Sequence, residues 1–256
     1  MKKRYVIGIC ICIVIVVFLA GRYTGLHSYD IAFAKKIRNV EQATGVVVLR
    51  LADGQYRPMG TAFLVQEEGY FLTAHHVIHE SHTEAGSLSQ NGVPYLLIRS
   101  NLGSNEMFQV EDIQNDDLAE KDILLFKAKD FNLDLDPLKI AQPEDVKRPG
   151  MEVGFVGFTI IDNPTSPDYS LFSGKGTLSN VGTNFNSQRI YTVYGIATHG
   201  FSGGAVFLSS NGKVIGLVEG GGGDELGKTG IVYVPPVHDV PRIIANLKQP
   251  PQEYSS

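Results

Sequence analysis

The chain has 256 residues, of which 43% are hydrophobic and 19% are charged, and its formal net charge is −5. This length corresponds to one or two domains, and the hydrophobic share excludes disorder for the bulk of the chain. Lys2, Lys3 and Arg4 carry +3, so the rest of the chain carries −8. An acidic body argues against nucleic-acid binding, which needs a basic face. Both cysteines, Cys10 and Cys12, lie near the N-terminus, so the rest has neither a disulfide framework nor a thiol nucleophile.

An unbroken apolar run spans residues 5–20, directly behind the three basic residues. The basic flank predicts a cytoplasmic N-terminus and export of everything that follows. As a helix the run would be about 24 Å long, short of a bilayer core of roughly 30 Å. We favour a signal anchor at residues 1–21 that holds the protein to the membrane with an extracytoplasmic body. The alternative is a signal peptide, cleaved near Ala32-Phe33-Ala34, and a secreted protein.

The sequence after the apolar run predicts three further parts of the chain. Residues 22–39 mix charges with apolar side chains and indicate a stalk that is compatible with a helix. A folded domain is expected at residues 40–248, and the polar tail at residues 249–256 is expected to be disordered. Within the domain only residues 238–248 show the apolar stripe of a helix, with Pro241 suited to its first turn.

Short apolar and β-branched runs, separated by Gly, Asn and Pro turns, predict about a dozen strands in the domain. These runs lie at residues 45–51, 61–65, 70–73, 93–99, 107–113, 122–128, 151–158, 170–181, 188–194, 204–208, 213–219 and 230–235. Because no helices alternate with them, the pattern favours an all-β antiparallel sandwich or barrel. The glycines at residues 220–223 are expected to form a flexible loop and not a phosphate-binding turn, since no Lys-Ser or Lys-Thr pair follows.

Three segments carry residues suited to nucleophilic catalysis, each at the end or start of a predicted strand. They are Leu72-Thr73-Ala74-His75-His76-Val77, then Lys121-Asp122-Ile123-Leu124-Leu125, then Gly200-Phe201-Ser202-Gly203-Gly204. A serine nucleophile needs a base to take its proton and an acid to orient that base. Glycines beside the serine leave backbone N–H groups free to meet an oxyanion.

The three segments, in the order His, Asp, Ser, resemble the trypsin-like (chymotrypsin-fold) serine peptidases, and most closely the bacterial HtrA/Deg type. Further motifs of the resemblance are Gly60-Thr61-Ala62-Phe63 before the first segment and Gly212-Lys213-Val214-Ile215-Gly216 after the third. The resemblance covers about residues 42–247. It implies two six-stranded antiparallel β-barrels with the site between them, followed here by a C-terminal helix. The PDZ domain of HtrA/Deg enzymes is not expected, since the chain stops about 20 residues after the last matching strand.

Carried over residue by residue, the resemblance implies that His76 is the general base, Asp122 orients it and Ser202 is the nucleophile. His76 is preferred to His75 because Val77 follows it. The N–H groups of Gly200 and Ser202 would then form the oxyanion hole. The implied activity is a serine endopeptidase that cleaves polypeptide substrates through an acyl-enzyme, without a metal or other cofactor.

The same resemblance predicts where the substrate lies. Ile196 would form the base of the pocket for P1, the residue whose carbonyl is attacked, and no acid occurs between residues 190 and 202. The pocket should therefore prefer a small or medium apolar side chain. The other residues expected to contact substrate are His199, Val218, Glu219, Gly220 and Gly221. Val218 would narrow one wall, the glycines would leave room for the substrate backbone, and Glu219 would place a second carboxylate near Asp122. Two alternatives to an apolar P1 are a polar P1 that hydrogen-bonds His199 and a cationic P1 that Glu219 accepts.

Phe201 departs from the family in a way that concerns activation. Trypsin-type zymogens are expected to have an Asp directly before the serine, which pairs with the new N-terminus. A phenylalanine cannot pair with an ammonium group, so the domain is expected to need no proteolytic maturation.

The same residues also permit other interpretations. The histidines at 75, 76, 79 and 82 lack the spacing of a His-Glu-x-x-His zinc motif, so a metal site is not expected. Gly200 to Gly204 also fits the Gly-x-Ser-x-Gly turn of α/β-hydrolases, but that turn must lead into a helix and residues 205–208 indicate a strand. The remaining alternative is a catalytically silent, membrane-tethered binding module on the same fold.

Overall fold

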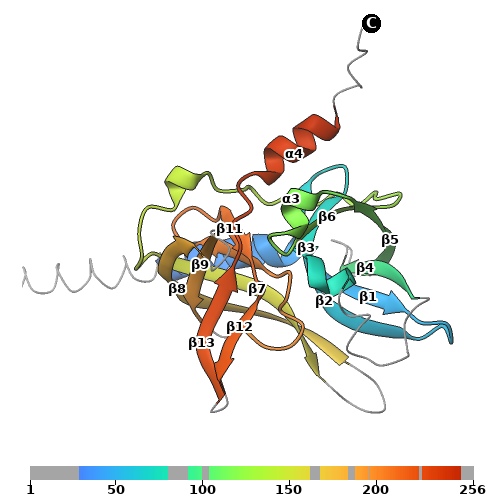
Figure 1. The fold of residues 1–256 in the computed structure, drawn as a ribbon. Coiled ribbons are helices and arrows are strands. Elements are labelled where there is room, and N and C mark those ends of the chain that lie inside the picture. Colours follow the sequence, from blue (N-terminus) through green and yellow to red (C-terminus); the bar gives the residue numbers. More distant parts are fainter. Residues whose placement is uncertain are drawn as a thin grey trace, which may run out of the picture.

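The computed structural model describes residues 29–79, 92–99, 104–161, 168–183, 188–195, 197–224 and 227–248, and it consists mainly of β-strands in two halves (Figure 1). The strands of the first half are β1 (Thr44–Arg50), β2 (Tyr56–Gln66), β3 (Tyr70–Ala74), β4 (Val93–Arg99), β5 (Asn105–Ile113) and β6 (Ile123–Ala128). Those of the second half are β7 (Glu152–Ile161), β8 (Asp168–Thr183), β9 (Arg189–Tyr194), β10 (Ala205–Leu208), β11 (Val214–Leu217), β12 (Gly220–Asp224) and β13 (Gly227–Val234). Short helical segments are α2 (His75–His79), α3 (Asp116–Ala119) and η1 (Pro143–Asp145), and α4 (Val240–Leu247) follows the last strand.

The first half is a closed barrel with strand order β1-β2-β3-β6-β5-β4, as the family resemblance implies. Every neighbouring pair is antiparallel. The interior is filled by side chains such as Phe63, Phe71 and Phe126, none of which is exposed. Phe71 and Phe126 stack with ring centroids 5.6 Å apart. This dense packing gives β3 and β6 fixed positions, and the first two catalytic segments lie at the ends of these strands.

The second half is a seven-stranded sheet of order β11-β10-β7-β8-β9-β13-β12, and not the closed six-stranded barrel that was expected. The additional strand is β12, so the expectation of a flexible glycine loop is also wrong. Gly220 and Gly221 pair with Tyr233 and Val232 of β13, which gives their backbone groups hydrogen-bond partners without any side chain. An isolated antiparallel bridge between Gly216 and Pro236 links the opposite end of the sheet to the segment after β13.

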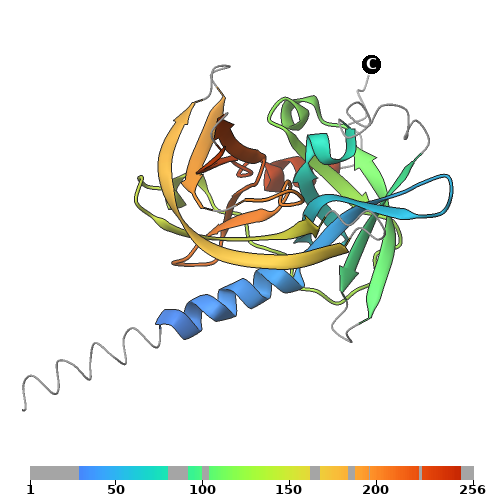
Figure 2. The same cartoon turned by 90° about the horizontal axis from the view of Figure 1, so that it is seen from below.

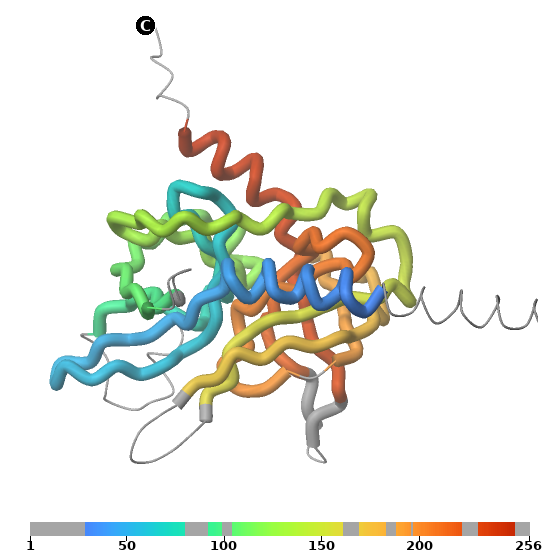
Figure 3. Tube along the Cα trace, turned by 180° about the vertical axis from the view of Figure 1, so that it is seen from behind, coloured from blue at the N-terminus to red at the C-terminus, as the bar shows by residue number. Residues whose placement is uncertain are grey.

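The segment expected to be a stalk does not stand clear of the domain where the structure describes it. Residues 29–42 are helical and lie across the back of the second half (Figure 3). Phe33 is only 5% exposed and stacks on Phe207 of β10 with ring centroids 6.2 Å apart. The Nζ group of Lys36 donates to the carbonyl of Ser209 at 2.8 Å. Phe33 and Val40 of this helix are therefore part of the core, whereas Ile31 is 60% exposed, and burial of the apolar side chains stabilises the docked helix.

The expected membrane segment at residues 1–21 and the expected disordered tail at residues 249–256 lie outside the described residues. Within the described ranges, no helix is both long enough and apolar enough to cross a bilayer.

The two halves share one hydrophobic core, which fixes their relative position. Side chains of both halves belong to it, among them Leu72 of β3 and Leu217 of β11. The connecting segment between β6 and β7 crosses from one half to the other, as Figure 2 shows. Along it, Leu138 donates its N–H to the carbonyl of Leu64, and Ile140 forms a parallel bridge with Val214. Residues from the two halves can therefore form a site with a defined geometry where the halves meet.

Candidate active site

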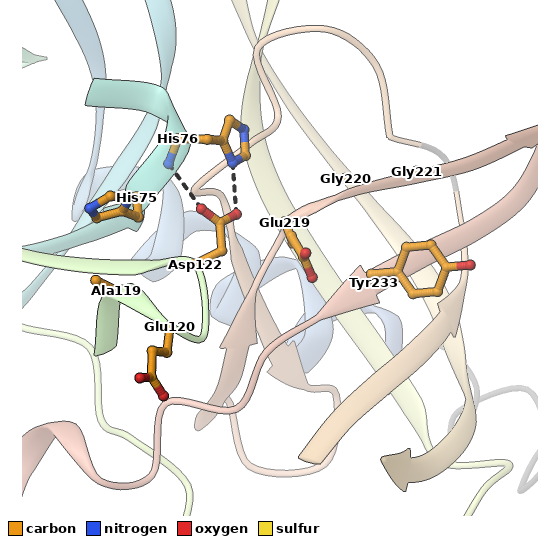
Figure 4. A pocket seen from close by; sticks show the side chains of 9 residues that line it. All are labelled: His75, His76, Ala119, Glu120, Asp122, Glu219, Gly220, Gly221 and Tyr233. Carbon is orange, nitrogen blue, oxygen red and sulfur yellow. Dashed lines mark hydrogen bonds and ion pairs between the residues drawn. The ribbon is translucent and has the colours of Figure 1, made fainter. Parts of the chain in front are cut away.

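His76 and Asp122 are brought together by the pairing of β3 with β6. Ala74, the last residue of β3, lies opposite Ile123, the first residue of β6, so the residues next to them in sequence meet at the barrel rim. Asp122 Oδ2 lies 2.7 Å from His76 Nδ1, and Asp122 Oδ1 accepts the His76 backbone N–H at 2.9 Å. The N–H of His75 also donates to the carbonyl of Asp122 at 3.1 Å. These contacts fix the His76 imidazole beside the Asp122 carboxylate, and Figure 4 shows the two that the carboxylate makes.

This geometry determines which nitrogen of His76 is available for chemistry. An ionised carboxylate only accepts hydrogen bonds, so Nδ1 carries the proton and Nε2 is the unprotonated nitrogen. The two side chains are 30% and 20% exposed, so the pair is partly shielded from water and still reachable by a substrate. Asp122 has φ of 55°, in the left-handed region that Asp tolerates better than most residues. A histidine held in this way is suited to act as a general base.

The third catalytic segment forms a tight turn in the second half, just before β10. Gly200 has a φ of 93° and Gly203 has a φ of 84°, values that residues other than Gly rarely adopt. A Cβ on Gly203 would lie 2.0 Å from the carbonyl oxygen of Thr61, so the turn could not approach β2 with another residue there. Ser202 Oγ donates to the carbonyl of Glu219 at 3.2 Å. Glu219 itself lines the same cavity as His76 and Asp122, so Ser202 of the second half contacts a residue of that cavity.

Thr61 fixes the nucleophile turn against the first barrel, and sequence reasoning missed it. Its N–H donates to the carbonyl of Ser202 at 2.8 Å, and its Oγ1 donates to the carbonyl of Gly200 at 2.7 Å. The same Oγ1 accepts the N–H of Phe158 at 2.8 Å. Thr61 is fully buried, so these bonds are shielded from water. In the sequence Thr61 is only part of a family motif, because contacts across 139 residues leave no local pattern.

Two backbone donors of the turn have no partner within the described part of the chain, namely the N–H groups of Gly200 and Ser202. By contrast, the N–H of Phe201 donates to Thr198 and that of Gly203 to Val218. The carbonyl of His199 accepts the N–H of Ile160 at 2.9 Å. Since C=O and N–H point in opposite directions across a trans peptide, the N–H of Gly200 points away from Ile160. The two N–H groups that the family resemblance implies for the oxyanion hole thus have no partner among the described residues.

A cavity of about 440 Å³ lies beside His76 and Asp122, and Figure 4 shows the side chains around it. Its lining comprises His75, His76, Ala119, Glu120, Asp122, Glu219, Gly220, Gly221 and Tyr233. Three of the expected substrate contacts, Glu219, Gly220 and Gly221, are thus found next to the catalytic pair. Burial raises the pKa of the Glu219 carboxyl, the charge of Asp122 raises it further, and His76 lowers it in part.

Of the other expected substrate contacts, Val218 and His199 are not among the residues that line this cavity. Val218 is 2% exposed and packs in the core of the second half. The backbone of Val218 holds the turn around Ser202, because its carbonyl accepts the N–H of Gly203 and its N–H donates to the carbonyl of Gly204. His199 is exposed next to the nucleophile turn, and Ile196 lies outside the described residues.

Ala119, Glu120 and Tyr233 line the cavity although sequence reasoning did not select them. Glu120 could have been found, since it lies two positions before Asp122 in a turn that follows α3. That turn begins at Asn115, whose side chain caps α3 by accepting the N–H of Leu118 at 3.0 Å. Tyr233 is brought in by the pairing of β13 with β12, which was not expected.

The histidines near the site do not gather around a common point. His75 and His79 stack with ring centroids 4.3 Å apart, and His79 Nε2 lies 3.0 Å from Asp112 Oδ2. Among the described residues there is no group of three or more side chains arranged to hold a metal ion.

Comparison with known proteins agrees with this arrangement. Residues 60–217 match the family described as "Trypsin-like peptidase domain", a range that contains His76, Asp122 and Ser202. No curated protein matches the sequence.

Solved structures of HtrA-type proteases have a similar fold. The crystal structure of Deg5 is 16% identical with a TM-score of 0.60, and the match covers 83% of this chain and 92% of that one. The HtrA-type protease AlgW with a decapeptide is 15% identical with a TM-score of 0.60, and the match covers 84% of this chain and 67% of that one. These similarities concern the fold, whereas the match over residues 60–217 identifies the family. The chain therefore belongs to the trypsin-like serine peptidases.

Proposed function

We propose that the protein is a serine endopeptidase in which Ser202 attacks the scissile peptide bond, His76 transfers the protons and Asp122 orients His76. The observation that carries this proposal is the 2.7 Å contact between His76 Nδ1 and Asp122 Oδ2. It is supported by the hydrogen bond from Ser202 Oγ to the carbonyl of Glu219, whose residue lines the same cavity as His76 and Asp122.

The chemistry follows from the protonation state of His76. Its Nε2 takes the proton of the Ser202 hydroxyl as Oγ attacks the carbonyl carbon of the substrate. The imidazolium that forms is stabilised by the adjacent Asp122 carboxylate, and it then gives its proton to the leaving amine. Water hydrolyses the resulting acyl-enzyme by the same route, with His76 again accepting and returning a proton.

The N–H groups of Gly200 and Ser202 are proposed to stabilise the oxyanion of the tetrahedral intermediate. Both are without a partner in the described structure, so they need not break a bond before they bind the oxyanion. Loss of one such donor in a serine peptidase costs a factor of about 10²–10³ in kcat.

The P1 residue is proposed to be small or medium in size and apolar. This rests on the sequence, since no acid occurs between residues 190 and 202 to pair with a basic P1 side chain. A buried unpaired charge would cost several kcal/mol, which is enough to exclude it.

An activated serine can be detected with a fluorophosphonate probe, which phosphonylates only a serine whose proton is removed by a base. The wild-type protein should react with the probe, and Ser202→Ala should not, while both give the same far-UV circular dichroism spectrum. Labelling that persists in Ser202→Ala would refute the assignment of the nucleophile. A folded wild-type protein that does not react would favour a catalytically silent binding module.

We further propose that the apolar run at residues 5–20 anchors the protein in the membrane with the catalytic domain on the extracytoplasmic side. The proposal rests on the three basic residues before the run. Cleavage near residues 32–34 would remove Phe33 from the core and also the bond of 2.7 Å that Tyr29 Oη donates to Glu152. A mature N-terminus at Lys35, found by mass spectrometry, would overturn the anchor.

A further inference from the structure

Glu219 places a negative charge in the cavity beside the catalytic pair without a positive partner. Its side chain lies between Asp122 and Tyr233 in the view of Figure 4. No ion pair joins it to a Lys or Arg within the described ranges. The nearest basic residue in sequence to the catalytic acid, Lys121, is turned away and bonds to Asp239 at 3.3 Å.

The surroundings of Glu219 make its ionised form unfavourable in the free protein. The carboxyl is partly buried, and the charge of Asp122, which has the same sign, outweighs the opposite effect of His76. Glu120, exposed on that wall, adds a second negative charge to the lining. A cation entering the cavity would therefore be attracted by all three carboxylates and would offset the unfavourable environment of Glu219.

The cavity is also placed where a bound peptide must pass. It contains His76, which has to reach the scissile bond, and its floor includes the first residues of β12. A Cβ on Gly220 would meet nothing within 4 Å, so the space above the strand is open. As the terminal strand of its sheet, β12 has an edge to which an extended peptide can be added by backbone hydrogen bonds.

We propose that Glu219 is a specificity-determining residue, which favours substrates that carry Lys or Arg beside the cleaved residue. This inference rests on the proposed peptidase function and extends it, since the P1 residue itself remains apolar. The amine or guanidinium of the neighbouring side chain would occupy the cavity and bind the Glu219 carboxylate. The cavity, at about 440 Å³, is large enough for the end of one such side chain.

The test uses peptides with a fixed apolar P1 residue and either Lys or norleucine at each flanking position in turn. Norleucine has the length of Lys without its charge, so the ratio of the two kcat/KM values reports the charge alone. At low ionic strength and about pH 8, one flanking position should favour Lys by about tenfold, which corresponds to a partly shielded ion pair. In Glu219→Gln this ratio should fall to about one, and in the wild type it should decrease with added salt.

Glu111→Gln is the matched control, since Glu111 is an exposed carboxylate on β5 that does not line the cavity. It should keep the wild-type ratio. A ratio near one at every position of the wild type, or an unchanged ratio in Glu219→Gln, would overturn the inference. The fluorophosphonate labelling of Ser202 tests the proposed peptidase function separately from this preference. If Glu219→Gln is unstable, the same peptides can be bound to Ser202→Ala, and fluorescence anisotropy then measures the Lys preference and its salt dependence without turnover. Equal binding of the Lys and norleucine peptides would again overturn the inference.

Discussion

Replacing Thr61 by Val removes one hydroxyl at the junction between the first barrel and the nucleophile turn and keeps the shape of the side chain. In the wild-type structure this hydroxyl donates to Gly200 and accepts from Phe158. The backbone N–H of Thr61, which donates to Ser202, is unaffected by the change. The variant therefore tests whether the hydroxyl positions the turn beyond what the backbone bond provides.

The magnitude follows from the two groups that lose their partner. Each buried polar group left unsatisfied costs about 1–3 kcal/mol, so Thr61→Val should lower the free energy of unfolding by about 2–6 kcal/mol. The carbonyl of Gly200 can recover a partner only by rotating, and rotation displaces the N–H groups proposed for the oxyanion hole. We expect the rate of reaction with a fluorophosphonate probe to fall by about 10²-fold, the loss typical of one misplaced donor.

Thr44→Val is the matched control for a loss of stability alone. Thr44 is 3% exposed, and its Oγ1 donates to the carbonyl of Val40 at 2.6 Å, away from the nucleophile turn. This variant should lose about 1–3 kcal/mol of stability and should react with the probe at the wild-type rate under conditions where it is folded. A folded Thr61→Val protein that reacts as fast as Thr44→Val would refute the positioning role.

Three further changes have separate expected outcomes. Asp122→Asn should slow probe labelling by about 10⁴-fold, because an amide in place of the carboxylate favours the wrong tautomer of His76. Phe33→Ala should lower the free energy of unfolding by about 3–5 kcal/mol in a urea titration, since this buried ring stacks on Phe207. For Glu219 the folded protein has a raised pKa and so binds the proton more tightly than the unfolded chain. Wild-type stability should therefore decrease relative to Glu219→Gln as the pH rises from about 4.5 through that raised pKa, and a series of Tm measurements against pH checks this.

Most of the strands could be predicted from the sequence because their side chains alternate or are β-branched. Predicted residues 93–99 coincide with β4, and the predicted helix at 238–248 contains α4. β12 could not be predicted in this way, since four glycines carry no preference for a strand. It forms by pairing with the backbone of β13, which is a property of the folded sheet and not of the local sequence.

The contact between His76 and Asp122 was predictable only through the family resemblance. No local pattern pairs residues 46 apart, but the register of β3 with β6 places them together once the barrel is closed. Val218 shows the opposite case. Its position in sequence suggested a pocket wall, but in the short segment between β11 and β12 its side chain packs in the core of the second half, whereas the next residue, Glu219, lines the cavity.

Phe201 connects the sequence to the proposed lack of a maturation step. Its ring is 2% exposed and meets Phe155 edge-on with ring centroids 6.1 Å apart. Gly157 leaves the space for it, because a Cβ there would lie 2.9 Å from the ring. An acid at this position would need a buried ammonium as its partner, and in the trypsin-type zymogens that partner exists only after cleavage. An aromatic ring needs only apolar neighbours, which the folded second half already provides, so burial of Phe201 can hold the residue before Ser202 in place without a new N-terminus.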